Sequence, residues 1–337
     1  MNISIPDDFK MVYTPIHGSG NKLVRSILDK IGAKNVFVVP EQELPDGNFP
    51  TVKSPNPENM EAFDLAIEYA KKQNADLVFG TDPDSDRIGV VVKTSRGEFK
   101  VLNGNQTGML LCEFILRKMK EGGVLTNRHT VVKTIVTTEM VRKIADDYGA
   151  DVIDVLTGFK FIGEKIKEFE RSGDRKFVFG LEESYGYLKG TYARDKDAVV
   201  AAMLICEMAA DYKTSGKTLY DGLMEIYKKY GYVKSGLKTL TLKGSDGAEK
   251  IKAIMKRMRE NKPQTIAGYA VNEVKDYSNG IDGMPKSDVL KFFLDKGWFA
   301  VRPSGTEPKI KFYYEIETEP NSDVDEKISE FIEKSAE

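Results

Sequence analysis

The stretch FKMVYTPIHGSGNKLVRSILDKIGAKNVFVV, residues 9–39, decides the fold of the first part of the chain. FKMVYT (9–14) is predicted to be a strand, NKLVRSILDKIG (21–32) a helix that stops at its glycine, and NVFVVP (35–40) a second strand. Strands that alternate with helices indicate βαβ units, in which the strands run parallel within one sheet.

The same alternation continues downstream and then restarts. Further segments with strand or helix periodicity are a helix at 60–74, strands at 75–80 and 88–94, and a helix at 106–123. TVVKTIVTTEMVRKIADDYGADVIDV (130–155) then repeats the order strand, loop, helix, Gly-Ala, strand. KFVFGLEESYG (176–186) is a further strand that runs into a polar loop, and a long helix follows from about 197 to 212. We therefore expect a second α/β domain built like the first.

The texture of the sequence changes after KKYGY (228–232). VLKFFLD, WFAVRPS and KIKFYYEIE are typical of antiparallel strands, and two amphipathic helices, at 247–261 and 324–336, accompany them. The predicted fold is α/β, with two successive three-layer α/β domains that have mainly parallel sheets, followed by a C-terminal α+β domain. The expected boundaries are 1–125, 126–230 and 231–337.

Composition excludes several classes of protein. Lys and Arg number 50 against 52 Asp and Glu, so no basic excess points to nucleic acid. Cys112 and Cys206 lie in helix-like stretches and indicate buried thiols. No apolar run approaches the roughly 18–20 residues that span a bilayer, and no signal peptide pattern opens the chain. We expect a cytoplasmic protein with no nucleic-acid or membrane partner.

GTDPDSDR (80–87) places three aspartates at alternate positions directly after an apolar strand. Asp82, Asp84 and Asp86 should lie at the carboxyl edge of a sheet, where α/β proteins bind ligands. Alternate residues of a tight loop can direct their carboxylates to one centre. This all-oxygen set suits Mg²⁺ or Ca²⁺, and Mg²⁺ is favoured because three carboxylates leave room for a substrate phosphate. A solvent-exposed turn rich in aspartate is the alternative.

An EF-hand loop also begins with alternating aspartates, but it requires Gly at its sixth position and Glu at its twelfth. Here those positions hold Arg87 and Lys93, and strands flank the loop, so an EF-hand is excluded. The planar guanidinium of Arg87 is a candidate phosphate contact. A simple salt bridge from Arg87 to one of the aspartates is the alternative.

Two more loops carry groups that bind phosphate or sugar. RPSGTEPK (302–309) combines the guanidinium donors of Arg302, the hydroxyls of Ser304 and Thr306, and Gly305, which allows backbone N–H groups to turn toward an anion. This combination predicts an anion site. An ordinary β-turn is the alternative. GLEESYG (180–186) offers paired acids and a hydroxyl that commonly hold sugar hydroxyls. A glycosidase pair fits less well, because adjacent carboxylates diverge whereas hydrolytic acids flank one bond about 5–9.5 Å apart.

Three basic or titratable residues lie near these loops. Lys196 in ARDKD (193–197) and Lys160 in TGFKFIG (157–163) could transfer protons, neutralise a phosphate, or be solvated surface charges. His17 in TPIHGSG (14–20) could act as a polar contact or proton carrier, although a lone histidine is more often structural. The glycines of that loop precede a helix, and the backbone N–H groups at a helix N-terminus can bind an anion.

Together, in this order, the loops TPIHGSG, GTDPDSDR, TGFKFIG, GLEESYG, ARDKD and RPSGTEPK resemble the phosphoglucomutase/phosphomannomutase family, the α-D-phosphohexomutases. The resemblance covers nearly the whole chain, and the aspartate loop with the last motif is highly specific. GLEESYG with ARDKD is more similar to the phosphoglucomutase/phosphopentomutase branch than to the bacterial phosphomannomutase branch, whose sugar loop usually has the sequence GEMSGH. It implies domains two to four of a four-domain mutase, the last of them a TATA-box-binding-protein-like α+β domain.

The resemblance also implies a role for each matching residue. A phosphoserine enzyme of this family converts a sugar phosphate into a bisphosphate, which reorients and returns the other phosphate. By position, the aspartates would bind Mg²⁺, Arg87 would contact the transferring phosphoryl group, and Lys196 would serve proton transfer. Sugar hydroxyls and phosphate would be held by Glu182, Glu183, Ser184, Lys160, Arg194, Arg302, Ser304, Gly305 and Thr306. The expected partner is a hexose or pentose phosphate, most simply a glucose phosphate.

One departure from the family pattern matters most. The family's serine lies in a T-A-S-H-N-P loop, and no Ser-His pair occurs in these 337 residues. We therefore expect the chain alone to lack mutase activity, being either a truncated form or one that depends on a second chain for its nucleophile. Two other classes remain open: a non-catalytic phosphosugar-binding module, and a metal-dependent phosphatase that uses Asp82 as nucleophile.

Overall fold

The computed structural model describes residues 3–242, 246–305 and 307–336. The chain divides into two compact units, Met1–Tyr230 and Gly231–Glu337, and each is described by itself. The predicted α/β fold class is confirmed, with parallel strands in the first unit and an antiparallel α+β arrangement in the second. None of the helices in the described ranges is long and apolar enough to cross a membrane.

The first sheet has five strands in the order β2-β1-β3-β4-β5. Its strands are β1 (Lys10–Thr14), β2 (Asn35–Val38), β3 (Leu77–Thr81), β4 (Ile88–Lys93) and β5 (Phe99–Leu102). β1 lies parallel to β2 and β3, with Val12 opposite both Phe37 and Val78, whereas β3-β4 and β4-β5 are antiparallel. The sheet is mixed because β3 and β4 are joined by only residues 82–87, which are too few for the crossover that parallel strands require.

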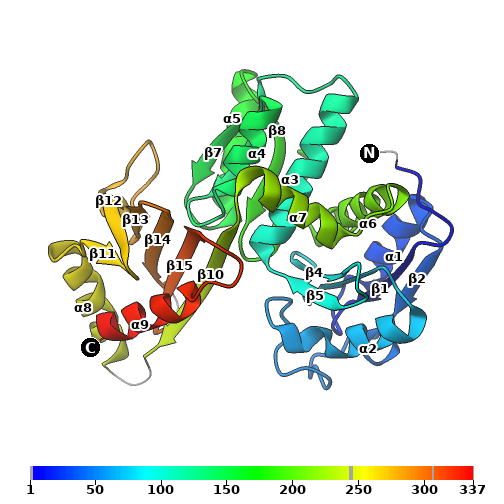
Figure 1. Ribbon diagram of the computed structural model, residues 1–337, viewed down its shortest axis with the longest axis horizontal. Helices are drawn as coiled ribbons and strands as arrows, with labels where there is room; N and C mark the ends of the chain where they lie inside the picture. The colour runs from blue at the N-terminus through cyan, green and yellow to red at the C-terminus, as the bar shows by residue number, and fades with distance from the viewer. Residues whose placement is uncertain (1–2, 243–245, 306, 337) are drawn as a thin grey trace. The chain divides into compact units, whose positions relative to one another are not determined.

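Helices cover both faces of this sheet. They are α1 (Asn21–Lys30), α2 (Asp64–Gln73) and α6 (Ala198–Thr214), with short 3₁₀ helices at Pro40–Gln42 and Met60–Phe63. Figure 1 shows α2 on one face and α1 with α6 on the other. Ala66 and Ala70 of α2 pack with Val12 and Val78 in one buried cluster, because small residues at helical spacing allow the helix to approach the strands closely.

The second sheet has four strands in the order β7-β6-β8-β9. Its elements are β6 (His129–Thr134), β7 (Asp151–Val155), β8 (Lys176–Glu182), β9 (Gly186–Lys189), α3 (Gly104–Glu121), α4 (Met140–Tyr148), α5 (Phe159–Ser172) and α7 (Leu219–Tyr230). β6 is parallel to β7 and β8, and β9 returns antiparallel to β8 through residues 183–185. Ile162 and Ile166 of α5 pack on Val132 and Val155 of this sheet. The repeated strand–helix–strand order of 130–155 is thus present.

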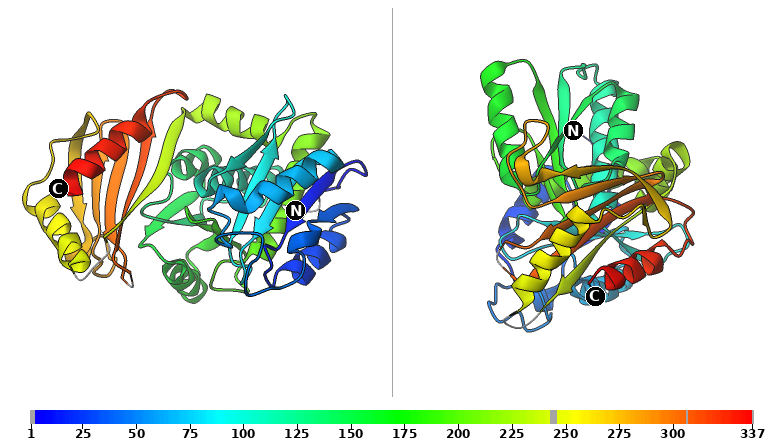
Figure 2. Two further views of the ribbon diagram at one scale, coloured as in Figure 1. Left: turned by 90° about the horizontal axis from the view of Figure 1, so that it is seen from below. Right: turned by 90° about the vertical axis from the view of Figure 1, so that its left-hand side faces the viewer.

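The second unit contains a six-stranded antiparallel sheet in the order β10-β15-β14-β13-β12-β11. Its elements are β10 (Val233–Thr241), α8 (Gly247–Glu260), β11 (Thr265–Ile266), β12 (Tyr269–Asp276), a 3₁₀ helix (Tyr277–Asn279), β13 (Leu290–Leu294), β14 (Gly297–Pro303), β15 (Lys309–Glu317) and α9 (Val324–Ala336). Both helices cover one face of the sheet (Figure 2). Phe299 lies at the centre of the core between them, with Phe292, Phe312 and Phe331 around its ring.

Removal of the Phe299 ring should destabilise the second unit. Phe299 is fully buried, so Phe299→Ala is expected to cost about 3–5 kcal/mol of unfolding free energy through lost burial and the cavity that remains. Phe293→Ala on the neighbouring strand is the control, because that side chain is only partly buried. Urea unfolding of both variants provides the measurement, and equal losses for the two would contradict this core.

Candidate functional site

The aspartate loop is a tight hairpin connection between β3 and β4. The backbone N–H of Ser85 donates to the carbonyl of Asp82 at 3.0 Å, and Ser85 adopts a positive φ of 60°. Asp82 Oδ1 accepts from the backbone N–H groups of Asp86 at 3.0 Å and Arg87 at 2.9 Å. These bonds fold the loop back on itself and direct alternate side chains to one side.

The three carboxylates converge, as the sequence predicts. One oxygen each from Asp82, Asp84 and Asp86 lies within 4.8 Å of the others. Asp86 Oδ1 is buried and has no hydrogen-bond partner within the described part of the chain. Burial raises the pKa of Asp82 to about 7, the N–H of Arg87 opposes that shift, and the neighbouring carboxylates of Asp86 and Asp84 add to it. An unpartnered buried oxygen within a repelling carboxylate group fits a hard divalent cation such as Mg²⁺.

Two cationic side chains flank the carboxylates. Lys196 Nζ lies 2.6 Å from Asp86 Oδ2. Arg87 Nε lies 3.7 Å from Asp86 Oδ1 and 3.9 Å from Asp82 Oδ2, while its Nη1 lies 2.9 Å from Glu58 Oε1. Burial lowers the pKa of Lys196, but the hydrogen bond with Asp86 and the negative charges of Asp86 and Asp195 together outweigh burial, so the net shift of the pKa is upward. Lys196 is therefore a stable cation beside the aspartates.

Backbone contacts fasten the GLEESYG loop to the aspartate loop. Arg87 and Gly186 form an antiparallel β-bridge, and the N–H of Ile88 donates to the carbonyl of Tyr185 at 3.1 Å. Gly186 allows Lys196 to pack closely here, because a Cβ at position 186 would lie 2.4 Å from Cδ of Lys196 and would displace that side chain. Two loops about 100 residues apart in sequence thus form one surface, with Lys196 packed against it.

The paired acids of GLEESYG diverge, as adjacent residues are expected to do. Glu182 Oε1 accepts from the N–H of Gly158 at 2.8 Å, at the start of α5. Glu183 Oε2 instead accepts from Thr134 Oγ1 at 3.2 Å and Thr137 Oγ1 at 3.4 Å. Burial raises the pKa of Glu182 to about 7, with a further contribution from Glu183. Ser184 lies between them in sequence and is half-buried.

His17, the expected polar contact or proton carrier, forms contacts through both of its ring nitrogens. Its Nδ1 lies 3.3 Å from the carbonyl of Leu44 and its Nε2 lies 2.9 Å from Thr51 Oγ1. Both ring nitrogens are thus engaged with the segment 44–51, and the ring is buried. The next residues support the aspartate loop, since the N–H of Ser19 donates to the carbonyl of Pro83 at 2.8 Å. His17 therefore holds the segment 44–51 in position.

Lys160 and Arg194, two predicted substrate contacts, have neighbours outside the GLEESYG loop. Lys160 is exposed in the first turn of α5, with its ammonium 4.9 Å from the centre of the Phe161 ring. Within TGFKFIG, α5 begins at Phe159. Arg194 forms an ion pair with Glu170 near the end of α5.

In the second unit, the predicted phosphate loop follows β14. Arg302 and Lys311 are direct cross-strand neighbours on β14 and β15. Neither has an ion pair with a carboxylate of the described residues, and two unneutralised cations side by side repel unless an anion lies between them. The N–H of Ser304 donates to the carbonyl of Lys309 at 2.8 Å, and Gly305 is exposed. Thr306 lies outside the described residues.

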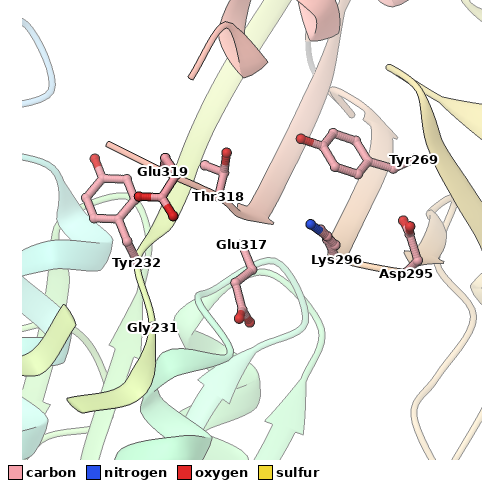
Figure 3. Close-up of a pocket in the computed structure, with 8 residues that line it drawn as sticks. All are labelled: Gly231, Tyr232, Tyr269, Asp295, Lys296, Glu317, Thr318 and Glu319. Carbon is pink, nitrogen blue, oxygen red and sulfur yellow. The ribbon is translucent and has the colours of Figure 1, made fainter. Parts of the chain in front are cut away.

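A separate cavity of about 640 Å³ lies at the other end of the same strands (Figure 3). Its lining includes Asp295 and Lys296, which lie in the turn that leads into β14. It also includes Glu317, the last residue of β15, and Glu319, which follows that strand. Three carboxylates and one lysine give it a net negative lining, which disfavours a phosphate group. The cationic pair at Arg302 and Lys311 remains the better anion site of this unit.

Several residues of the site have no recognisable signal in the sequence. Glu58 contacts Arg87 from 29 positions upstream, and Thr134 and Thr137 contact Glu183 from the end of β6. Gly104 is another, because a Cβ there would lie 2.0 Å from the carbonyl oxygen of Glu183. Each contact joins elements distant in sequence, so only the tertiary arrangement reveals it.

Three models of the phosphoglucomutase/phosphomannomutase family match the chain in order. They describe α/β/α domain II at residues 2–97, α/β/α domain III at 103–230 and the C-terminal domain at 248–330. The chain is 37% identical over 336 residues to the phosphoglucomutase of Staphylococcus aureus strain USA300, a match that covers 96% of this chain and 60% of that protein. The chain therefore spans about 60% of the length of the curated relatives it matches.

Solved structures share the fold at low sequence identity. A phosphoglucomutase/phosphomannomutase family protein from Burkholderia thailandensis superimposes with a TM-score of 0.72 at 17% identity, covering 99% of this chain and 61% of that one. N-acetylphosphoglucosamine mutase from Aspergillus fumigatus, in complex with GlcNAc-6P and magnesium, gives a TM-score of 0.57 at 15% identity, covering 99% of this chain and 66% of that one.

The buried Glu182 carboxyl should make stability depend on pH. Its pKa rises from 4.5 to about 7 on folding, so the folded state holds the proton more tightly and the wild-type chain loses stability as pH rises through that window. Glu182→Gln keeps an acceptor for Gly158 and removes the ionisable group. Its stability relative to wild type should increase from pH 4.5 to 7, by at most about 3 kcal/mol.

Urea unfolding in EDTA across this pH range measures the difference. Glu164→Gln on the exposed side of α5 is the control for the loss of one negative charge. A Glu182→Gln advantage that stays flat or shrinks as pH rises would contradict the burial of this carboxyl.

Proposed function

Because the chain belongs to the phosphoglucomutase/phosphomannomutase family, the α-D-phosphohexomutases, we propose that it takes part in phosphosugar mutase chemistry. The reaction would move a phosphate between the 1-position and the 6- or 5-position of a sugar, through a bisphosphate intermediate. Glucose phosphates are the proposed substrates, since curated relatives whose matches cover 96% of the chain are named phosphoglucomutases. The domain division 1–125, 126–230 and 231–337 is part of this proposal.

The observation that carries the proposal is the junction of the aspartate and GLEESYG loops. The Arg87–Gly186 bridge holds them together, and the Lys196–Asp86 ion pair of 2.6 Å joins ARDKD to the same centre. The groups proposed to bind metal, phosphate and sugar hydroxyls thus lie on one surface. A plain phosphosugar-binding module needs only the last two, so the converged carboxylates favour catalysis.

Mg²⁺ is the proposed cofactor, held by Asp82, Asp84 and Asp86. Three carboxylate oxygens within 4.8 Å of one another, one of them buried without a hydrogen bond, fit such an ion. When bound, the ion would neutralise charge on a phosphoryl oxygen. The Asp82 carboxylate has its Oδ1 engaged by two backbone N–H groups, which argues against Asp82 as the nucleophile of a phosphatase.

The chain's own residues bind and orient the substrate in this proposal. Arg87 donates hydrogen bonds to the transferring phosphoryl group, and Lys196 supplies positive charge and a proton beside it. Glu182, Glu183 and Ser184 accept from or donate to sugar hydroxyls, and Lys160 and Arg194 would have to leave their present surroundings to join them. His17 acts indirectly, by holding the segment 44–51.

The second unit is proposed to hold the phosphate that is not transferred. Arg302 and the facing Lys311 would pair with the dianion, while Ser304, Gly305 and Thr306 would donate from the connecting loop. This assignment depends on the cross-strand pair of cations, which no carboxylate of the described residues neutralises.

Titration calorimetry with Mg²⁺ and glucose 6-phosphate, mannose 6-phosphate or ribose 5-phosphate tests the phosphate site. Arg302→Ala should weaken binding by roughly 10- to 100-fold, which is the range for loss of a charge-assisted hydrogen-bond pair. Lys296→Ala, which removes a cation from the other end of the same strands, is the control and should leave affinity unchanged. Equal effects of the two variants would remove Arg302 from the site.

A coupled assay for glucose 6-phosphate formation from glucose 1-phosphate tests the nucleophile. The family's Ser-His pair is absent from these 337 residues, so we expect the chain by itself to show no turnover even when glucose 1,6-bisphosphate is added. Sustained turnover would show that another residue of this chain carries the phosphoryl group.

A further inference from the structure

The guanidinium of Arg87 is surrounded by carboxylates on both of its edges. Nη1 contacts Glu58 at 2.9 Å, and Nε faces Asp86 at 3.7 Å and Asp82 at 3.9 Å. Nη2 has no partner among the described residues. A phosphate accepts two parallel hydrogen bonds from an arginine through Nη2 and either Nη1 or Nε. Of the three carboxylates, Glu58 alone lies within hydrogen-bond distance of its nitrogen. Bidentate phosphate binding through Nη1 and Nη2 therefore requires Glu58 to release Nη1.

The three carboxylates differ in how firmly they are held. Asp82 accepts two backbone hydrogen bonds through Oδ1, and Asp86 is paired with Lys196 at 2.6 Å. The Glu58 carboxylate contacts only Arg87 among the described side chains. Glu58 also lies outside regular secondary structure, just before the 3₁₀ helix Met60–Phe63. Of the three, Glu58 is the one that can move at least cost.

Glu58 also has a place to move to. It lines a cavity of about 490 Å³ together with Val52, Lys53, Ser54, Asn59, Met60, Glu61 and Ala62. Lys53 supplies a cation on that lining, and its present partner is Glu61 at 3.2 Å, with both side chains well exposed. A carboxylate released from Arg87 thus has room beside another positive charge.

We propose that Glu58 is a displaceable counter-ion of Arg87 that sets the affinity of this site for phosphoryl groups. Without ligand, Glu58 holds the Nη1 edge of the guanidinium; with ligand, the phosphoryl oxygens replace it and the carboxylate turns into the cavity lined by Lys53. The inference rests on the proposed role of Arg87 as a phosphoryl contact. It adds Glu58 to that role as a positioning residue acting through Arg87.

The test measures binding of inorganic phosphate by calorimetry at fixed MgCl₂, in an Arg302→Ala background so that the second unit does not contribute. Glu58→Gln should tighten binding about threefold to tenfold, the worth of a half-exposed ion pair that phosphate no longer has to break. Glu68→Gln removes the same charge from an exposed position of α2 that does not line this cavity, and it should change affinity less than twofold.

Structural damage cannot raise affinity, so a gain specific to Glu58→Gln supports displacement. Unchanged or weaker binding by Glu58→Gln would overturn the inference, and weaker binding would mean that Glu58 orients Arg87 for the phosphate.

The Arg87→Ala variant distinguishes failure of this inference from failure of the proposed function. If Arg87→Ala binds phosphate as well as the parent, Arg87 is not a phosphoryl contact at all. Should Glu58→Gln fold poorly, Glu58→Asp, whose shorter side chain cannot reach Arg87 as closely, should show the same gain.

Discussion

Mutual repulsion among three aspartate carboxylates in one six-residue connection is the constraint on which the rest of the site depends. Oxygens within 4.8 Å of one another store electrostatic energy that backbone donors and nearby cations must offset. The N–H groups of Asp86 and Arg87 offset it at Asp82, and Lys196 offsets it at Asp86. The loop, the ARDKD segment and Arg87 are therefore held together by the charge of the aspartates, and a divalent cation would complete the same balance.

The fold delivers these groups through two short hairpins. β3 and β8 are central strands whose ends open into residues 82–87 and 183–185, and antiparallel β4 and β9 return from them. Because both connections are too short for a helix, their side chains stay at the sheet edge, and the Arg87–Gly186 bridge joins the two edges. Glycine at 186 and 104 permits backbone and side-chain approaches that a Cβ would block. Packing in the first unit thus determines which acids face the same surface.

Much of this could be predicted from the sequence, because local patterns decided it. Short apolar segments that alternate with helical patterns predict β1, β3 and β6, and the spacing of Asp82, Asp84 and Asp86 predicts their convergence. Other features of the site depend on tertiary contacts, which local patterns do not predict. His17 has both ring nitrogens engaged with the segment 44–51, and TGFKFIG begins a helix that packs on the second sheet. The contact between Glu58 and Arg87 could not be predicted, because no motif around Glu58 indicates a partner 29 positions away in the sequence.

The central claim, that the aspartate loop is a divalent cation site, is tested most directly by diffraction from crystals soaked in Mn²⁺, which substitutes for Mg²⁺ and scatters anomalously. The account predicts one anomalous peak with carboxylate oxygens of Asp82, Asp84 and Asp86 about 2 Å away. A data set in which the aspartates show no peak, while Lys196 keeps its contact with Asp86, would contradict it: the cluster would then be neutralised by the protein's own cations alone.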